Sequence, residues 1–579
     1  MYTVAVETLL RMTAVEPHEE LKARGELVEF EDSADQTASF VSHQWMTQHH
    51  PDPECEQLKI LQGAFTHLLS SGGSVPVDFV TEAFVLTAKP IPKSTFRTSA
   101  LVVWYDYFSV PQLEKRQTFG ADDKDGSQQA RGINSIPAYV ARCKHFLALC
   151  PALKSDSKVL GAMTWSQRGW CRVERAAREL SPDSTWILIK SSTCLEVLGG
   201  TTSFPTGPVG EGNFSNEEDR QTLAPVMRSI VMRKMLHCLK RRDFPGFRRQ
   251  LNLQSVHFRG LEVQPIDGLL DIDHDADAVS QFLFQNGLRN VRKPDTAGWW
   301  PLHYAALSGQ AEVIRGLLQL RASVNQRTSK PEPNLGVPPW MSALDLAALF
   351  AHRDAALALI SAGADMEGGV APAQNYTPMM DDVEGLRALR AAGARREATG
   401  ILGHCPLHVA AGMNSLLCME ELAPHSSTEE LNMALGITAL RGGSVEQVQL
   451  LISNQADVNC QYDVAREMNR LFRFAIRATA LALRCGKGTG FSTIAYHFHR
   501  STPLMHAVRM ANYETAAALI ANGARVDSDL CDSRGFSVAD FAKGQSIPHF
   551  LQKGLDGDPS ECERVMSLAF ENGMIEVAF

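Results

Sequence analysis

The chain has 579 residues and a net charge of -9, with 44% hydrophobic and 21% charged residues. At about 100 to 200 residues per domain this length allows several domains, and the composition is that of a globular protein, not a fibrous or disordered one. The mildly acidic balance excludes a global positive field that would draw the whole molecule to nucleic acid or anionic lipid.

The sequence predicts neither a membrane span nor a secretory signal. No stretch approaches the roughly 18 to 20 apolar residues of a membrane span, and Glu7 and Arg11 fall where a signal peptide needs an unbroken apolar core. The twelve cysteines are scattered and include no CxxC pair, which favours free thiols in a reducing compartment. We therefore expect a cytoplasmic location.

After an N-terminal extension (1–35), residues 36–198 are predicted to form an α/β domain. Short β-rich runs alternate with helical patterns in this segment, which is typical of a parallel sheet with helices on both faces. Strands are expected at 38–42, 101–105, 145–150 and 185–190. Helices are expected at 55–71, around Ile136, Val140 and Cys143, and at 168–180.

The carboxyl ends of the predicted strands carry polar side chains. In an open parallel sheet the ligand crevice lies beyond these ends, because the loops there are free to face a ligand. Ser42 and His43 follow the first strand, and Asp106 follows the second. Asp106 has an alternative role as the cap of the turn before Pro111.

The helix predicted at 168–180 places a carboxyl group beside an aromatic ring. Trp170 begins the apolar stripe of this helix, and Glu174 lies one turn further along, at the edge of that stripe. A carboxylate in this position is half desolvated. A structural alternative stays open, in which Trp170 anchors the core and Glu174 forms an i,i+4 ion pair with Arg178 worth a few tenths of a kcal/mol.

Three segments resemble the sequence blocks of fungal heterokaryon-incompatibility domains: SHQW (42–45), VWYDYFSVPQ (103–112) and RGWCRVE (168–174). The order of elements is similar to the wider TIR-like fold, a flavodoxin-like parallel sheet. In TIR domains that hydrolyse NAD, the catalytic glutamate lies in a W-C-x-x-E helix start, which Trp170, Cys171 and Glu174 match. The resemblance covers about residues 35–195.

This resemblance implies cleavage of the bond between nicotinamide and ribose, with NAD as a substrate and no permanently bound cofactor. The reaction passes through an oxocarbenium-like centre, whose positive charge a carboxylate at Glu174 would stabilise. Trp170 or Tyr105 would stack on a flat ring. Contacts to phosphate are expected from Ser42, His43 or Arg168.

We predict no metal site. His43, His49 and His50 lie close together in the sequence, but no carboxylate or thiol joins them at a convincing spacing. The glycine-containing segment at 485–493 lacks the GxxxxGK[ST] order of a phosphate-binding loop and is predicted to be a turn.

Residues 199–265 are predicted to connect two domains. The Gly, Pro and Ser density of 199–220 indicates a linker, and the helical stretch after it, 227–250, carries eight Lys or Arg against one acid. Such a run is usually a solvated helix face; the alternatives are an acidic protein partner or anionic lipid. Nucleic acid is not favoured, because no aromatic residues interleave with the charges.

The segment 266–556 repeats. WPLHYAALSGQAEVIRGLLQLRASVNQ (300–326) resembles the ankyrin unit of about 33 residues, whose T-P-L-H-x-A start opens a pair of helices. The interval between residues 459 and 501 contains either a degenerate unit or an insertion, and 557–579 is expected to be a tail. Looser copies occur at 342–366, 377–394, 405–412, 434–459, 502–526 and 537–544.

An ankyrin stack presents an extended concave surface that usually recognises a protein. The sequence therefore predicts an intracellular signalling or defence-type protein, in which the repeats bind a protein partner and the TIR-like domain hydrolyses NAD. The alternative is a non-catalytic scaffold, in which the TIR-like domain mediates only self-association or docking.

Overall fold

The computed structural model describes residues 1–577 except for 32–34, 48, 86, 98, 113–130, 133, 156–157, 201–206, 267–276, 468 and 487. Part of the linker expected at 199–220 therefore lies outside the described residues.

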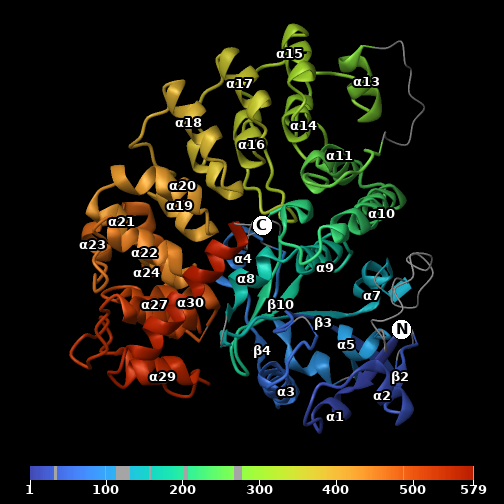
Figure 1. The fold of residues 1–579 in the computed structure, drawn as a ribbon. Helices are drawn as coiled ribbons and strands as arrows, with labels where there is room; N and C mark the ends of the chain where they lie inside the picture. Colours follow the sequence, from blue (N-terminus) through green and yellow to red (C-terminus); the bar gives the residue numbers. More distant parts are fainter. Residues whose placement is uncertain are drawn as a thin grey trace.

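A seven-stranded mixed sheet forms the core of the N-terminal half (Figure 1). In chain order its strands are β1 (Tyr2–Ala5), β2 (Leu27–Glu29), β3 (Gln36–Ser42), β6 (Ala100–Tyr105), β7 (His145–Leu149), β10 (Trp186–Ile189) and β11 (Leu195–Leu198). Across the sheet the order is β11-β10-β7-β3-β6-β1-β2. The parallel strands β10, β7, β3 and β6 at its centre are the four that the sequence predicts.

The expectation of a wholly parallel sheet is wrong at both edges. Strands β1, β2 and β11 all pair with their neighbours in the antiparallel sense. They are short, and sequence periodicity identifies a strand of three or four residues poorly. Since residues 2–5 and 27–29 form β1 and β2, the segment expected as an N-terminal extension belongs to the sheet.

Helices cover both faces of the sheet, because alternate side chains of each strand point to opposite sides. Val41 and Leu147 pack in one core cluster with helix α3 (Glu56–Leu69). Phe40 and Phe146 pack in another, with helices α7 (Ile136–Arg142), α9 (Gly169–Glu179) and α10 (Glu218–Lys240). Helices α3, α7 and α9 lie where the sequence predicts helices.

The expected basic connector packs on the α/β domain. Met227, Ile230 and Val231 of α10 join the core cluster of α7 and α9, while Arg228 and Arg233 are exposed. The other helices and short strands of this half are α1 (Val6–Leu9), α2 (His18–Ala23), β4 (Ser74–Val75), α4 (Phe79–Phe84), β5 (Ile91–Pro92), η1 (Lys93–Phe96), α5 (Asp106–Ser109), β8 (Leu153–Lys154), β9 (Val159–Leu160), α8 (Ala162–Gln167), η3 (Val209–Glu211), α11 (Phe244–Asn252) and α12 (Gln254–His257).

The C-terminal half is a stack of paired helices. In the first clear unit, helices α14 (Pro301–Ser308) and α15 (Ala311–Gln319) bury Leu302 and Leu317 against neighbouring units. His303 of the TPLH-like start accepts a hydrogen bond from Trp300 N at Nδ1 (3.0 Å) and donates from Nε2 to Gln326 O (3.1 Å). Burial lowers the pKa of His303 to about 4, so this histidine is a neutral structural bridge.

The stack continues through helices that occur mostly in pairs and form an arc (Figure 1). Their bounds are α13 (Ala278–Gln285), α16 (Ala343–Leu349), α17 (Arg353–Ser361), η4 (Ala373–Asn375), η5 (Thr377–Met380), α18 (Val383–Ala391), α19 (Pro406–Met413), α20 (Leu416–Leu422), η6 (Ala423–His425), α21 (Thr428–Arg441), α22 (Val445–Ser453), α26 (Pro503–Arg509), α27 (Tyr513–Ala521), α28 (Val538–Ala542), α29 (His549–Leu555) and α30 (Ser560–Val577).

The interval between residues 459 and 501 is helical. It forms α23 (Val464–Glu467), α24 (Arg470–Arg484) and α25 (Gly490–His497). Ile476 of α24 and Ile494 of α25 lie in one core cluster with Leu440 of α21. The prediction of a turn at 485–493 is wrong for residues 490–493, which form the start of α25. The segment expected as a C-terminal tail is the long helix α30, which packs against α27, α29 and β9.

Both ends of the repeat arc contact the α/β half, so the chain closes into a ring (Figure 1). At the first end, Arg249 Nη2 lies 2.6 Å from Glu332 Oε2 in a buried ion pair. At the last end, Lys154 pairs with Glu561, and Lys190 Nζ donates to Asn512 Oδ1 at 3.4 Å.

None of the helices in the described part of the chain combines the length and the hydrophobicity that crossing a membrane requires.

Candidate functional site

A cavity of about 1340 Å³ lies between the carboxyl end of the parallel strands and the inner side of the ring. Ser42 and Tyr105 are buried beneath it, with side chains in contact with residues that form its wall. The other predicted site residues line it: His43, Asp106, Arg168, Trp170 and Glu174.

Asp106, at the end of β6, accepts three hydrogen bonds. Its Oδ1 accepts from His43 Nε2 at 2.8 Å and from Tyr107 N at 2.6 Å, and its Oδ2 accepts from Trp45 Nε1 at 2.7 Å. Although burial opposes ionisation, His43 and these hydrogen bonds lower the pKa of Asp106 below its usual value. Asp106 is therefore an anion at neutral pH.

Tyr105 orients His43 from below. The two rings are stacked with centroids 4.0 Å apart, and the Tyr105 hydroxyl lies 3.2 Å from His43 Nδ1. His43 Nδ1 also lies 3.3 Å from Gln44 O, so the backbone after β3 helps to hold the ring. Burial raises the pKa of Tyr105, which keeps its hydroxyl protonated. Tyr105 therefore stacks on His43 and is shielded from the cavity, in place of the ligand stacking expected of it.

Glu174 lies on α9 and is 9% exposed at the cavity wall. Burial raises its pKa to about 8, and the charge of Asp106 adds to this shift, while a hydrogen bond from Ser42 opposes it. Ser42 is itself held in place by Trp165, whose Nε1 donates to Ser42 Oγ at 3.0 Å. The carboxyl of Glu174 is therefore mostly protonated at neutral pH, next to an ionised Asp106.

The ion pair considered between Glu174 and Arg178 is replaced by other contacts. Arg178 turns away and donates to the backbone carbonyls of Thr185, Cys143 and Lys144 at 2.8 to 3.0 Å. This leaves Glu174 in the cavity wall with Ser42 as its hydrogen-bonding partner.

Trp170 and Arg168 stand at the start of α9, on the same wall. Trp170 is half-buried, and its Nε1 donates to Asp219 Oδ2 at 2.8 Å, so the indole borders the cavity and is also fixed to α10. Arg168 Nη2 donates to Ser215 Oγ at 2.6 Å. Cys171 is buried, and burial raises its pKa well above the usual value, so it is present as a thiol.

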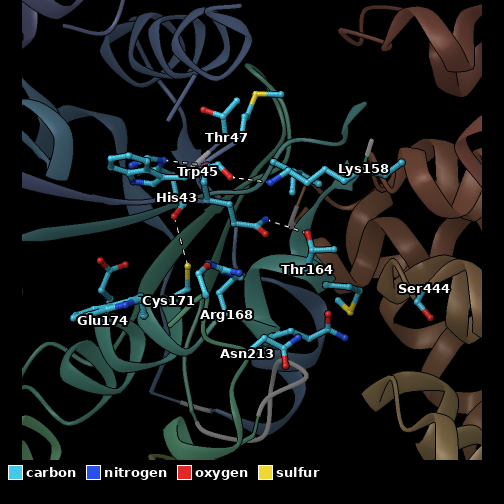
Figure 2. Close-up of a pocket in the computed structure, with 18 of the residues that line it drawn as sticks. His43, Trp45, Thr47, Lys158, Thr164, Arg168, Cys171, Glu174, Asn213 and Ser444 are labelled. Atoms are coloured by element: carbon cyan, nitrogen blue, oxygen red, sulfur yellow. Dashed lines mark hydrogen bonds between the residues drawn. The ribbon is translucent and has the colours of Figure 1, made fainter. Parts of the chain in front are cut away.

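The repeats supply the opposite wall, which no sequence pattern predicted. The residues come from the turns that precede the second helices of successive units, and Figure 2 shows Ser444 on this side of the cavity. Burial raises the pKa of Glu514 to about 8, and Glu446 adds to the shift. The residues that α18, α20, α22, α27 and the turns before them bring to the cavity are Asp381, Asn414, Leu416, Ser444, Glu446 and Glu514, and α30 adds Ala569 and Phe570.

Two further residues of the α/β wall were missed at the sequence level. Trp45 orients Asp106 and lies within the SHQW block, so the resemblance of that block could have identified it as a site residue. Lys158, which donates to Trp45 O at 3.2 Å, lies outside every motif. Among the residues described, no group of three or more His, Cys, Asp and Glu is arranged to hold a metal ion.

The comparison with known proteins concerns the repeat half. The sequence model of the ankyrin repeat family matches residues 297–329, the unit built from α14 and α15. A crystal structure of the human ASB11 ankyrin repeat domain is similar over 46% of this chain and 97% of that domain, at 20% identity and a TM-score of 0.31. No curated protein matches the chain.

Proposed function

We propose that the chain is a signalling or defence-type protein, in which the repeats bind a protein partner and the N-terminal domain is a TIR-like hydrolase of NAD. One observation carries the enzymatic part. Glu174, one helical turn after Trp170, lines the same nucleotide-sized cavity as the ionised Asp106. Two carboxyl groups whose environments move their pKa values in opposite directions are typical of catalytic sites.

Different residues of the cavity wall suit different parts of a dinucleotide. The half-buried indole of Trp170 offers a face for a flat ring. Arg168 and Lys158 supply positive charge for the diphosphate. The ionised Asp106 suits the positively charged nicotinamide ring, which attracts a carboxylate in a partly desolvated cavity.

The proposed reaction needs water as its only co-substrate. The bond between ribose C1′ and the nicotinamide nitrogen breaks, and neutral nicotinamide leaves with the bonding electron pair. Positive charge develops on the ribose, where the carboxylate form of Glu174 stabilises it. The oxygen of water then bonds to C1′, and a proton of that water passes to solvent.

The family match at residues 297–329 supports the protein-binding part. The α/β domain lies along the turns between paired helices, as the positions of Asn414 and Ser444 indicate. The partner surface that we propose is the one built by the first helices and the loops between units, which is a different edge of an ankyrin stack.

The test is NAD consumption by the purified full-length chain at high protein concentration, with released nicotinamide measured by chromatography. We expect Glu174→Gln, which keeps the shape of the side chain, to lower the rate about 100-fold or more. Glu211→Gln, at an exposed position outside the cavity, is the matched control and should retain the wild-type rate. Equal rates for wild type and Glu174→Gln would remove Glu174 from catalysis.

A second candidate function is a non-catalytic scaffold, in which the α/β domain only self-associates or docks. The observation that favours it is the closed ring, which holds this domain against the repeats at both ends. Absence of NAD turnover by the wild-type chain at high concentration would support the scaffold and overturn the enzymatic proposal.

A further inference from the structure

Helix α24 (Arg470–Arg484) lies in the interval between two ankyrin units and buries only one of its sides. Ile476 is 5% exposed and packs with Phe472 and Ala480 on the cluster around Tyr462 and Phe498. This side anchors the helix to the repeat array.

The opposite side of α24 exposes large apolar side chains. Leu471, Phe474 and Leu481 are 52%, 71% and 58% exposed, and Ala478 is exposed between them. Their spacing alternates between three and four residues, which is the a and d pattern of a helix that packs against another helix. Two exposed apolar residues of a repeat loop, Ile401 and Leu402, extend this stripe, because Asn469 Nδ2 donates to Ile401 O at 3.1 Å.

An arginine stands beside each step of the stripe. Arg470, Arg477 and Arg484 recur every seven residues, in the g position that flanks a helix–helix seam, and all three are exposed. The helix contains no acidic residue. The stripe therefore combines an apolar seam with positive charge along one border.

We propose that this side of α24, from Leu471 to Leu481, is a docking site for an amphipathic acidic helix of a partner protein. Such a helix would bury its own apolar stripe against Phe474 and Leu481 and place Asp or Glu opposite the arginines.

A second copy of this chain is not the occupant that the charges favour. In an antiparallel pair of α24 helices the g positions face one another, which places arginine against arginine. In a parallel pair each g position faces an e position, which here is Ala475 or Ala482. Neither arrangement neutralises the arginines, whereas an acidic helix does.

The probe is a fluorescent synthetic helical peptide with Leu at its a and d positions and Glu at its e and g positions, used where it is monomeric. Its binding to the full-length chain is measured by anisotropy beside that of a peptide with Lys in place of Glu. We expect the acidic peptide to bind about tenfold or more tightly than the basic one. Phe474→Ser should weaken this binding about tenfold, whereas Phe284→Ser, at a 55% exposed aromatic of α13, should leave it unchanged.

A second experiment tests whether the arginines select an acidic partner. The double variant Arg470→Glu and Arg477→Glu should reverse the preference, so that the basic peptide binds more tightly than the acidic one. Equal binding of both peptides to the wild type, or the same preference in the double variant, would overturn the proposal. Binding to phosphatidylserine vesicles that Phe474→Ser abolishes, without any binding of the acidic peptide, would assign the surface to a membrane instead.

Discussion

Glu174 on helix α9 and Glu514 on helix α27 line the same cavity from the two halves of the chain, and burial raises the pKa of each carboxyl to about 8. The glutamates belong to segments far apart in the sequence, which only the closure of the ring brings together. Both are mostly protonated at neutral pH, so the cavity between the two halves becomes more negative as the pH rises through about 8.

The packing of Glu514 beside Gly161, the residue that precedes α8, should weaken as the pH rises. The folded chain binds the proton of Glu514 more tightly than the unfolded chain does, because its pKa is raised from 4.5 to about 8. The free energy of unfolding therefore falls between these two pH values. We expect Glu514→Gln, which is neutral throughout, to show a smaller fall between about pH 5 and pH 8 in urea titrations. An identical pH slope in the two proteins would show that Glu514 ionises as freely in the folded state as in the unfolded state.

The proposed NAD hydrolysis should also depend on pH, with the opposite sign. The carboxylate form of Glu174 stabilises the developing positive charge, and its raised pKa leaves little carboxylate at neutral pH. The rate under kcat/KM conditions should therefore rise from pH 6 and level off above about pH 8. Glu174→Asp retains a carboxyl group, so its rate should be lower but should still rise with pH. A wild-type rate that falls between pH 6 and pH 8 would show that the protonated form of Glu174 is the active one.

The stacked repeats predict a stability difference between two leucines. Leu504 of α26 is 1% exposed in the core of the last units, whereas Leu357 of α17 is 46% exposed. Leu504→Ala should lower the free energy of unfolding by about 2 to 5 kcal/mol, and Leu357→Ala should change it by about 0.5 kcal/mol or less. Chemical denaturation followed by circular dichroism measures both, and equal effects would contradict the stacked core.

Sequence reasoning succeeded where a local pattern determines the structure. The four central strands are apolar runs, because a strand that is covered on both faces has few polar positions, as Phe40 and Val41 of β3 show. The TPLH-like starts identified repeat units, since His303 and His408 each join the start of a helix to the backbone of the segment that follows the helix pair. In both cases the signal lies within a few consecutive residues.

The parts that could not be predicted depend on contacts across the ring. Glu446 and Glu514 lie within repeat copies but outside their TPLH-like starts, and each reaches the cavity only because the repeat array curves back to the α/β half. Likewise, the half-buried position of Trp170 is set by Asp219 on α10, a helix that the sequence assigned to a connector. Contacts of this kind depend on tertiary packing, and the periodicity of the sequence does not predict them.

A helical repeat array with one free end can change its curvature without disturbing the rest of the protein, because each unit contacts only the units next to it. This array is tethered at both ends to one domain, by Arg249–Glu332 and Lys154–Glu561. Between these ends Arg441 Nη1 lies 3.7 Å from Asp78 Oδ1, so the array is also held at a middle unit. A change in its curvature is therefore opposed by all of these contacts with the domain that carries Glu174.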